Sequence, residues 1–187
     1  MGLAVDATAA GWAAELLDFV SRNRGWAPLV VAVFAATESV SFLSFLVPST
    51  VVLVGVGALV STGAIDFAPV WVAAVIGALA GTSLSWWLGW RYGPAVLSLP
   101  ALSLHAAPIA RAQSWFARWG VLAVFLGHIF APVTSMVFLL AGVARVRFWQ
   151  FQLANIPGAM IWAWFLPKAG ELGGQLVAWL WSLVAGG

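Results

Sequence analysis

Two ionisable side chains, Glu38 and His128, lie inside long apolar runs, and a proline with two hydroxyl residues follows each of them. The first run contains ESVSFLSFLVPST and the second contains LGHIFAPVTS. A carboxylate is costly in an apolar setting and histidine titrates near neutral pH, so both are candidates for proton coupling or substrate binding. The hydroxyl residues have two open roles, substrate contact or satisfaction of backbone groups in a turn. They are Ser49 and Thr50, which follow Pro48, and Thr134 and Ser135, which follow Pro132.

The composition defines the setting of these residues. Only 7% of the 187 residues are charged, 63% are hydrophobic, and the mean hydropathy is +1.02. A soluble domain cannot cover itself with so few charges, so we expect an all-α integral membrane protein with one domain over residues 1–187. The net charge of +2 reflects arginines at membrane edges and indicates no nucleic-acid partner. The chain has no cysteine, which excludes disulfides and cysteine-ligated metals.

The first half of the chain is expected to hold one surface helix, one hairpin and one membrane span. Residues 1–25 read as an interfacial helix, with packing onto the bundle as the alternative. The apolar run over residues 26–62 would reach roughly 55 Å as one helix, against a hydrocarbon core of about 30 Å. Because Pro48 disfavours helix before it, this run is expected to turn near residues 45–48 and return as a re-entrant hairpin. Residues 67–90 then cross the membrane, with glycines and serines forming a small-residue face.

The second half repeats this order after an interfacial connector over residues 91–118. A second hairpin is expected in residues 120–143, broken at Pro132, and a second span in residues 148–166. In both copies a phenylalanine, Phe67 or Phe148, precedes a Gly-Ala pair by ten residues. Repeats over 26–90 and 119–168, with one crossing each, must be inverted, and residues 169–187 add a short C-terminal helix.

Glu38 and His128 are expected to meet near the membrane midplane. Glu38 lies roughly 18 Å along a helix from Trp26, and His128 roughly 12 Å from Gly120 on the opposite side. In a hydrocarbon core about 30 Å thick these depths coincide. Asn155, in the middle of the second span, either lines the same cavity or forms an interhelical hydrogen bond.

Four stretches, taken together, resemble the DedA family, which is related to the SNARE-associated Golgi or VTT-domain proteins. They are ESVSFLSFLVPSTVVLVGVGALVSTG, GTSLSWWLGWRYG, FARWGVLAVFLGHIFAPVTSMVFLLAG and FQLANIPGAMIWA, colinear over about residues 26 to 172. The resemblance implies two facing re-entrant hairpins in a bacterial inner-membrane protein that moves lipids between leaflets. It also implies undecaprenyl phosphate recycling or phospholipid scrambling as the type of process, with dependence on the proton gradient.

The family pattern transfers unevenly to this chain. Glu38 matches the acid of the first hairpin and Pro48 its proline, while Gly127 and Pro132 match the pattern Gly-Arg-Phe-x-x-Pro-x-Arg of the second. His128 and Thr134 replace the two arginines of that pattern, and Thr50 and Thr82 stand where many members have carboxylates. Each departure removes a permanent charge. This argues against a phosphate-monoester headgroup, whose capture usually relies on arginine or lysine.

The sequence therefore predicts a lipid flippase or scramblase, multi-pass in the bacterial inner (cytoplasmic) membrane. The candidate substrates are phospholipid and undecaprenyl phosphate, with protons as the coupling ion and a homo-oligomer as one option for assembly. Two alternatives stay open: a non-transporting scaffold or degenerate paralogue, and a small-ion or solute carrier. The chain shows no HExxH, GxSxG or phosphate-loop motif, so we expect no enzyme, no cofactor and no metal site.

Overall fold

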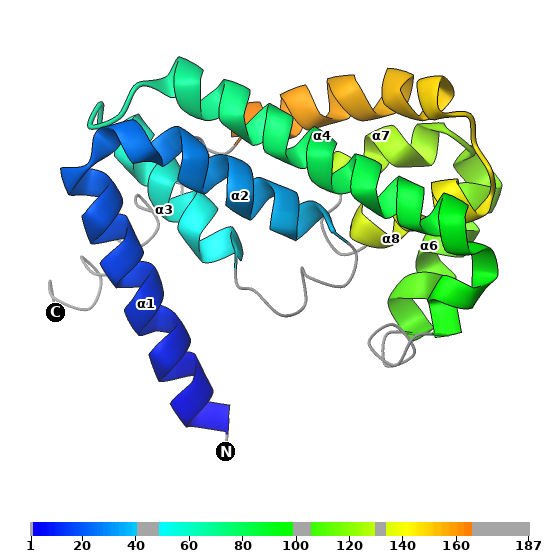
Figure 1. Cartoon of the computed structure of the whole chain (residues 1–187), viewed down its shortest axis with the longest axis horizontal. Helices are drawn as coiled ribbons and strands as arrows, with labels where there is room; N and C mark the ends of the chain where they lie inside the picture. Colours follow the sequence, from blue (N-terminus) through cyan, green and yellow to red (C-terminus); the bar gives the residue numbers. More distant parts are fainter. Residues whose placement is uncertain (1, 41–48, 99–105, 130–133, 166–187) are drawn as a thin grey trace, which may run out of the picture.

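The computed structural model describes residues 2–40, 49–98, 106–129 and 134–165, and every regular element within them is helical. This confirms the predicted all-α class. Figure 1 shows α4 running the length of the molecule, with α2 and α3 at one half and α6, α7 and α8 at the other. The elements are α1 (Gly2–Arg22), η1 (Arg24–Trp26), α2 (Ala27–Ser39), α3 (Ser49–Ser61), α4 (Phe67–Tyr92), η3 (Gly93–Ser98), α6 (Ala106–Trp119), α7 (Leu122–Ile129), α8 (Thr134–Val143) and a helix over residues 148–165.

The central helix α4 follows the apolar run that predicts it, but it continues two residues beyond Trp90. Asp66 precedes it in an extended conformation, and Gly93 ends it with a φ of 58°, a conformation that glycine adopts easily. Among the described residues, one helical stretch, Phe67–Val96, is long and apolar enough to cross a membrane. Its length therefore agrees with the first predicted span.

Glycines let the neighbouring helices approach α4 closely. A Cβ atom at Gly77 or Gly81 would collide with backbone oxygens of α2, those of Ala32 and Ala36. Further along α4, a Cβ at Gly89 would collide with the backbone oxygen of Leu139 in α8. Small residues of this kind permit close helix packing inside membranes. Small residues of α4 thus allow close contact with two helices, α2 at Gly77 and Gly81 and α8 at Gly89.

Two separate groups of buried apolar side chains hold the bundle together. One joins α1, α2, α3, the first half of α4 and, through Ala163, the end of the 148–165 helix. The other joins η3, α7, α8 and the start of the 148–165 helix, with Phe138 and Phe151 among its members, and Trp86 and Leu88 of α4 pack against it. Burial of apolar area stabilises each group, so each end of the bundle has a core to which both halves of the chain contribute.

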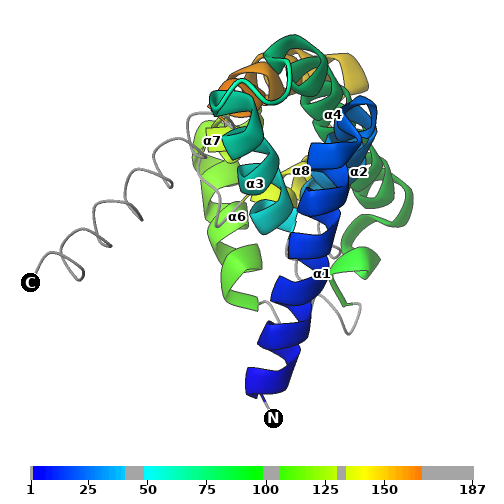
Figure 2. The ribbon, with the colours of Figure 1, turned by 90° about the vertical axis from the view of Figure 1, so that its left-hand side faces the viewer.

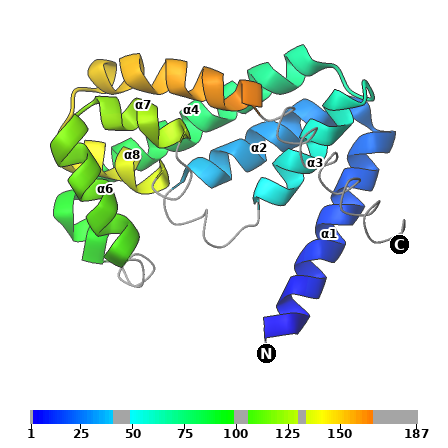
Figure 3. The ribbon, with the colours of Figure 1, turned by 180° about the vertical axis from the view of Figure 1, so that it is seen from behind.

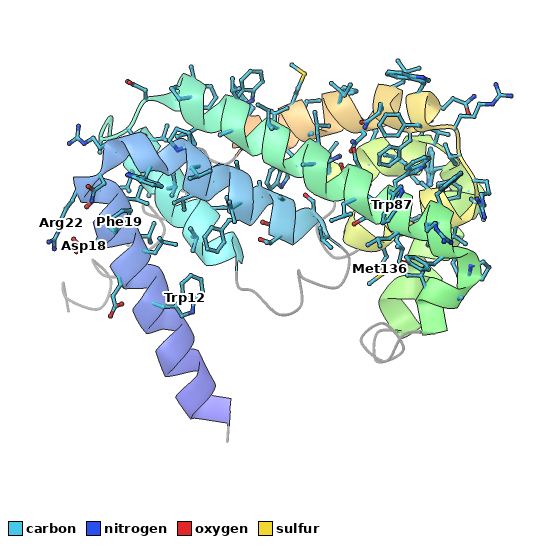
Figure 4. All side chains as sticks on the ribbon, viewed as in Figure 1. Trp12, Asp18, Phe19, Arg22, Trp87 and Met136 are labelled. Carbon is cyan, nitrogen blue, oxygen red and sulfur yellow. The ribbon has the colours of Figure 1, made fainter. Side chains whose placement is uncertain are left out.

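The N-terminal helix α1 packs on the bundle through its second half. Val20 is fully buried, and the indole of Trp12 stacks on Phe34 of α2 with ring centroids 6.0 Å apart. Asp18 and Arg22 form an ion pair on the outer side of α1, while Trp12 faces the bundle (Figure 4). Figure 2 shows the first half of α1 extending past the other helices. Of the two predictions for residues 1–25, a helix on the membrane surface or a helix packed on the bundle, the second describes the second half of α1.

The helices of both predicted hairpins pack in pairs, α2 with α3 and α7 with α8. The expected turns at residues 45–48 and around Pro132 lie outside the described residues, as does the C-terminal helix over residues 169–187. The second pair begins later than expected, because Gly120 adopts a φ of 54° and turns the chain before Leu122. Within residues 91–118, η3 and α6 form the connector.

Two tryptophans of α4 fix the 148–165 helix beside it. The indole Nε1 of Trp71 donates a hydrogen bond to the backbone oxygen of Met160, at 3.1 Å. The Nε1 of Trp86 donates to the backbone oxygen of Val146, also at 3.1 Å. Because the earlier tryptophan meets the later residue, the two helices run in opposite directions. Figure 3 shows the 148–165 helix along the upper edge of the molecule, with α7 below it.

Replacing Trp86 with phenylalanine tests the second of these bonds. The ring contacts with Trp90 and Phe148 can persist in a phenylalanine, whereas the indole N–H is lost. We expect a loss of about 1 kcal/mol in the free energy of unfolding in mixed micelles, the usual contribution of one hydrogen bond. Trp87→Phe is the control, since Trp87 is exposed. Equal stability of the two variants would contradict the assigned bond.

Candidate functional site

A chain of buried polar side chains connects α7, α4 and the 148–165 helix. His128 Nε2 lies 2.9 Å from Asn155 Oδ1, and Asn155 Nδ2 donates to Thr82 Oγ1 at 2.9 Å. Asn155 Nδ2 also donates to Gln152 Oε1 at 2.8 Å, and Gln152 Nε2 donates to Ser83 Oγ at 2.8 Å. His128, Asn155 and Thr82 are buried among apolar helices. We call these five residues the polar network.

The bonding directions in the polar network fix the state of one histidine nitrogen. The hydroxyl of Thr82 donates to the backbone oxygen of Ala78, so its oxygen accepts from Asn155. Asn155 uses its amide nitrogen toward Thr82 and Gln152, which leaves its oxygen facing His128. An amide oxygen only accepts, so His128 Nε2 carries a hydrogen and donates it to Asn155. The second ring nitrogen, Nδ1, is then the position that gains or loses a proton.

The ring of His128 fits into a space that a glycine provides. A Cβ atom at Gly158 would lie 2.7 Å from His128 Cδ2, closer than real contacts allow. The other side of the ring meets Phe138 of α8, with centroids 4.8 Å apart. Any larger residue at position 158 would therefore displace the imidazole from Asn155.

Glu38 lies near the end of α2, the part of that helix that contacts residues 81–85 of α4. Its Oε2 atom is buried. In the next residue, the backbone oxygen of Ser39 accepts a hydrogen bond of 3.0 Å from Ser85, and Gly81 leaves room for the Ser39 side chain. The end of α2 thus contacts α4 over residues 81–85, the turn that also carries Thr82 and Ser83. The direct pairing of Glu38 with His128 stays a prediction.

The structure brings together two of the predicted site residues, His128 and Asn155, in one hydrogen bond. Of the two roles open for Asn155, interhelical hydrogen bonding is the one observed. Ser49 and Thr50 form the start of α3, and Thr134 and Ser135 the start of α8, so their predicted headgroup contacts stay predictions. Pro48 and Pro132 lie outside the described residues. Within the described ranges, no three His, Asp or Glu side chains are grouped to hold a metal ion.

Sequence reasoning missed the roles of Gln152 and Ser83. Gln152 precedes Asn155 by three residues, a spacing that puts both amides on one face of a helix. Two amides sharing a face of an apolar helix were a usable signal for a polar network. The partners of these amides, Thr82 and Ser83, could not be predicted in the same way. Their sequence gives no sign of a bond to another helix, and which helix faces them is known only from the structure.

The helices pack around one long apolar helix, with a buried asparagine and histidine between them, an arrangement that helical membrane proteins share. Comparison with protein families agrees, since residues 47–172 match the VTT domain. Because this match covers more than half of the chain, the chain belongs to the VTT-domain family, the DedA family.

Relatives of this chain carry names that describe membrane proteins. It is 27% identical over 164 residues to inner membrane protein YabI of Escherichia coli K12, covering 88% of this chain and 65% of that protein. An uncharacterized membrane protein of Mycobacterium tuberculosis H37Rv is 33% identical over 141 residues, 72% of this chain and 65% of the relative. One from Synechocystis is 28% identical over 182 residues, 90% and 80% respectively. The chain thus spans less than two thirds of the first two relatives. No solved structure matches it significantly.

Proposed function

We propose that this protein is a lipid flippase or scramblase, multi-pass in the bacterial inner membrane, that passes lipid headgroups along a polar path between its two halves. The observation that carries the proposal is the polar network, from His128 through Asn155 to Thr82, buried among apolar helices. Polar groups at membrane depth are expensive and usually mark a transport path. The name of YabI, an inner membrane protein, supports the location.

The proposed architecture is a pair of inverted repeats. In the first repeat α2 and α3 form the re-entrant hairpin and α4 the span; in the second, α7 and α8 form the hairpin and the 148–165 helix the span. Two observations support it: the hairpin helices pack in pairs, and α4 and the 148–165 helix run in opposite directions. Inverted repeats place a substrate site at the interface of the copies near the midplane.

In the proposed mechanism Glu38 and His128 supply the charge changes that accompany headgroup passage. Protonation of His128 at Nδ1 creates a cation that attracts an anionic headgroup or Glu38, and loss of that proton releases it. Asn155 holds Nε2 as the donor, so Nδ1 alone changes state. The hydroxyls at the starts of α3 and α8 contact the headgroup. Phospholipid is the preferred substrate over undecaprenyl phosphate, because the arginines that suit a phosphate monoester are replaced.

Removing both ionisable groups tests this function. The variant combining Glu38→Gln and His128→Gln keeps polar side chains of similar size, so we expect folded protein. We expect headgroup transfer in proteoliposomes to slow by about tenfold or more, since about 1.4 kcal/mol at the barrier corresponds to tenfold. Dithionite accessibility of a fluorescent headgroup measures the transfer.

The matched control is Glu15→Gln with His105→Gln, which removes the same two residue types outside the predicted hairpins. Transfer unaffected in the test variant would overturn the proposed function. Wild-type protein that neither binds nor transfers lipid, yet co-purifies with a partner, would favour the scaffold alternative. Uptake of a solute that depends on pH, without lipid transfer, would favour the carrier alternative. The proposal involves no bond cleavage, cofactor or metal.

A further inference from the structure

An open groove on the surface of the molecule leads to the polar network. It has a volume of about 490 Å³ and lies between α4 and the 148–165 helix. Five of its six lining residues are apolar, and the sixth is Gln152. The apolar residues are Leu79, Phe148, Trp149, Leu153 and Ile156. Trp149 and Leu153 are each 77% exposed, so this surface is open to the surroundings of the bundle.

Gln152 belongs to both the groove and the polar network. Its Nε2 donates one hydrogen bond, to Ser83, and its Oε1 accepts one from Asn155. A glutamine amide has two N–H hydrogens and two acceptor positions, so these bonds occupy half of its capacity. The side chain is half-buried. Gln152 can therefore hydrogen-bond a molecule in the groove while it stays bonded to Asn155.

The depth of Gln152 indicates what that molecule is. The helix begins at Phe148, so Gln152 lies roughly 6 Å, about one turn, inside its end. Aromatic residues and arginines gather at that end, where Trp86 and Trp90 stack and Arg145 lies over the ring of Trp90. Such residues mark the membrane interface. One turn further in is the boundary between headgroups and hydrocarbon, the level of the glycerol esters of a phospholipid.

We propose that this groove binds one acyl chain of a phospholipid, whose ester carbonyl accepts a hydrogen bond from Gln152. The apolar lining fits the chain, and the single amide fits the ester at its head. Asn155 is bonded to both Gln152 and His128. A lipid ester bonded to Gln152 therefore polarises the amide of Gln152 and, through it, the amide of Asn155. This alters the hydrogen bond that His128 Nε2 donates to Asn155. Binding of a lipid in the groove thus changes the hydrogen bonding of His128 in the candidate site. This coupling goes beyond the proposed function because it needs no transport.

Nitrogen NMR of the histidine can detect this coupling directly. The chain has two histidines, so after His105→Gln and ¹⁵N-histidine labelling the ring-nitrogen resonances, Nδ1 and Nε2, all come from His128. The full chain is reconstituted into vesicles of diacyl phosphatidylethanolamine and phosphatidylglycerol, and separately into vesicles of the dialkyl ether forms, which lack ester carbonyls. We expect the Nε2 resonance of His128 to differ between the two vesicle types. Gln152→Leu should remove that difference.

The control is Gln150→Leu, two residues away in the same helix. Gln150 is exposed and lines a different groove, of about 620 Å³, on the side of α7. That variant should keep the full ester-to-ether difference. Leu79→Trp, which fills the proposed groove from α4, should lose it together with labelling of the groove by a phospholipid carrying a diazirine in its acyl chain.

Two outcomes would overturn the inference. One is a His128 Nε2 resonance that does not change between ester and ether vesicles in the ¹⁵N-labelled His105→Gln protein, which carries no further substitution. The other is a change of equal size in the Gln152→Leu and Gln150→Leu variants. The His128 resonance and the diazirine labelling do not depend on headgroup transfer. A protein that transfers no headgroups can therefore still show the coupling, and a protein that transfers them can lack it.

Discussion

Asn155→Leu is expected to destabilise the protein by about 2 kcal/mol, because three hydrogen bonds at about 0.6 kcal/mol each are lost inside the membrane bundle. The amide of Asn155 serves His128, Thr82 and Gln152 at once, and all three would be left with one partner fewer. Leucine fits the volume of the site but neither donates nor accepts. The free energy of unfolding, measured by denaturant titration in mixed micelles, gives the loss.

The same variant should also slow headgroup transfer, since His128 loses the acceptor that keeps Nε2 protonated. Gln150→Leu is the matched amide-to-leucine control in the same helix. Because Gln150 is exposed, we expect its stability to change by less than about 0.5 kcal/mol. If Asn155→Leu were as stable and as active as Gln150→Leu, the polar network would have no energetic or functional weight.

Gly142→Ala is expected to destabilise the protein by about 2 kcal/mol, because an overpacking cost of about 3 kcal/mol is offset by about 1 kcal/mol of helix propensity. The added Cβ would collide with the backbone oxygen of Trp86 and lie 2.7 Å from the backbone nitrogen of Trp90. Backbone atoms of a helix cannot rotate away as a side chain does. The contact between α4 and α8 must then open along its length. Thermal unfolding followed by circular dichroism measures the loss.

Gly127→Ala separates this collision from the intrinsic preference of alanine for helix. A Cβ at Gly127 would lie 3.6 Å from the ring of Phe138, an ordinary contact distance. Both substitutions gain about 1 kcal/mol of helix propensity, so the difference between them isolates the packing term. Equal unfolding temperatures in the two variants would show that α4 and α8 are not in the close contact described.

The sequence predicts the apolar helices that the structure describes, because its apolar runs are long. The central helix follows from the uncharged stretch after Asp66. Its small-residue face was expected from Gly77, Gly81, Ser83 and Ser85, of which Ser83 instead bonds Gln152 of the 148–165 helix. The sequence does not say which helix that face meets. Gly81 packs on α2 while Gly89, two turns later, packs on α8, and only the tertiary arrangement decides between them.

Sequence reasoning singled out two of the five residues of the polar network, His128 and Asn155, as site residues, and it specified none of the bonds that connect the five. His128 stands out in an apolar run, and Asn155 was open to interhelical bonding on the same grounds. The bond between them joins residues 27 positions apart, and the Thr82 bond spans 73. No local pattern specifies such distances. The indole bonds of Trp71 and Trp86 were missed for a related reason, because tryptophan in an apolar helix reads first as an interface anchor.

The two indole hydrogen bonds have a consequence for motion. They hold the 148–165 helix against α4 near both of its described ends, and the Ser83–Gln152 and Thr82–Asn155 bonds hold its middle. Sliding one helix along the other by a single turn would break all four bonds together. The antiparallel pair is therefore expected to move as one rigid unit, and in the proposed transport any opening toward one leaflet would come from movement of the paired shorter helices against it.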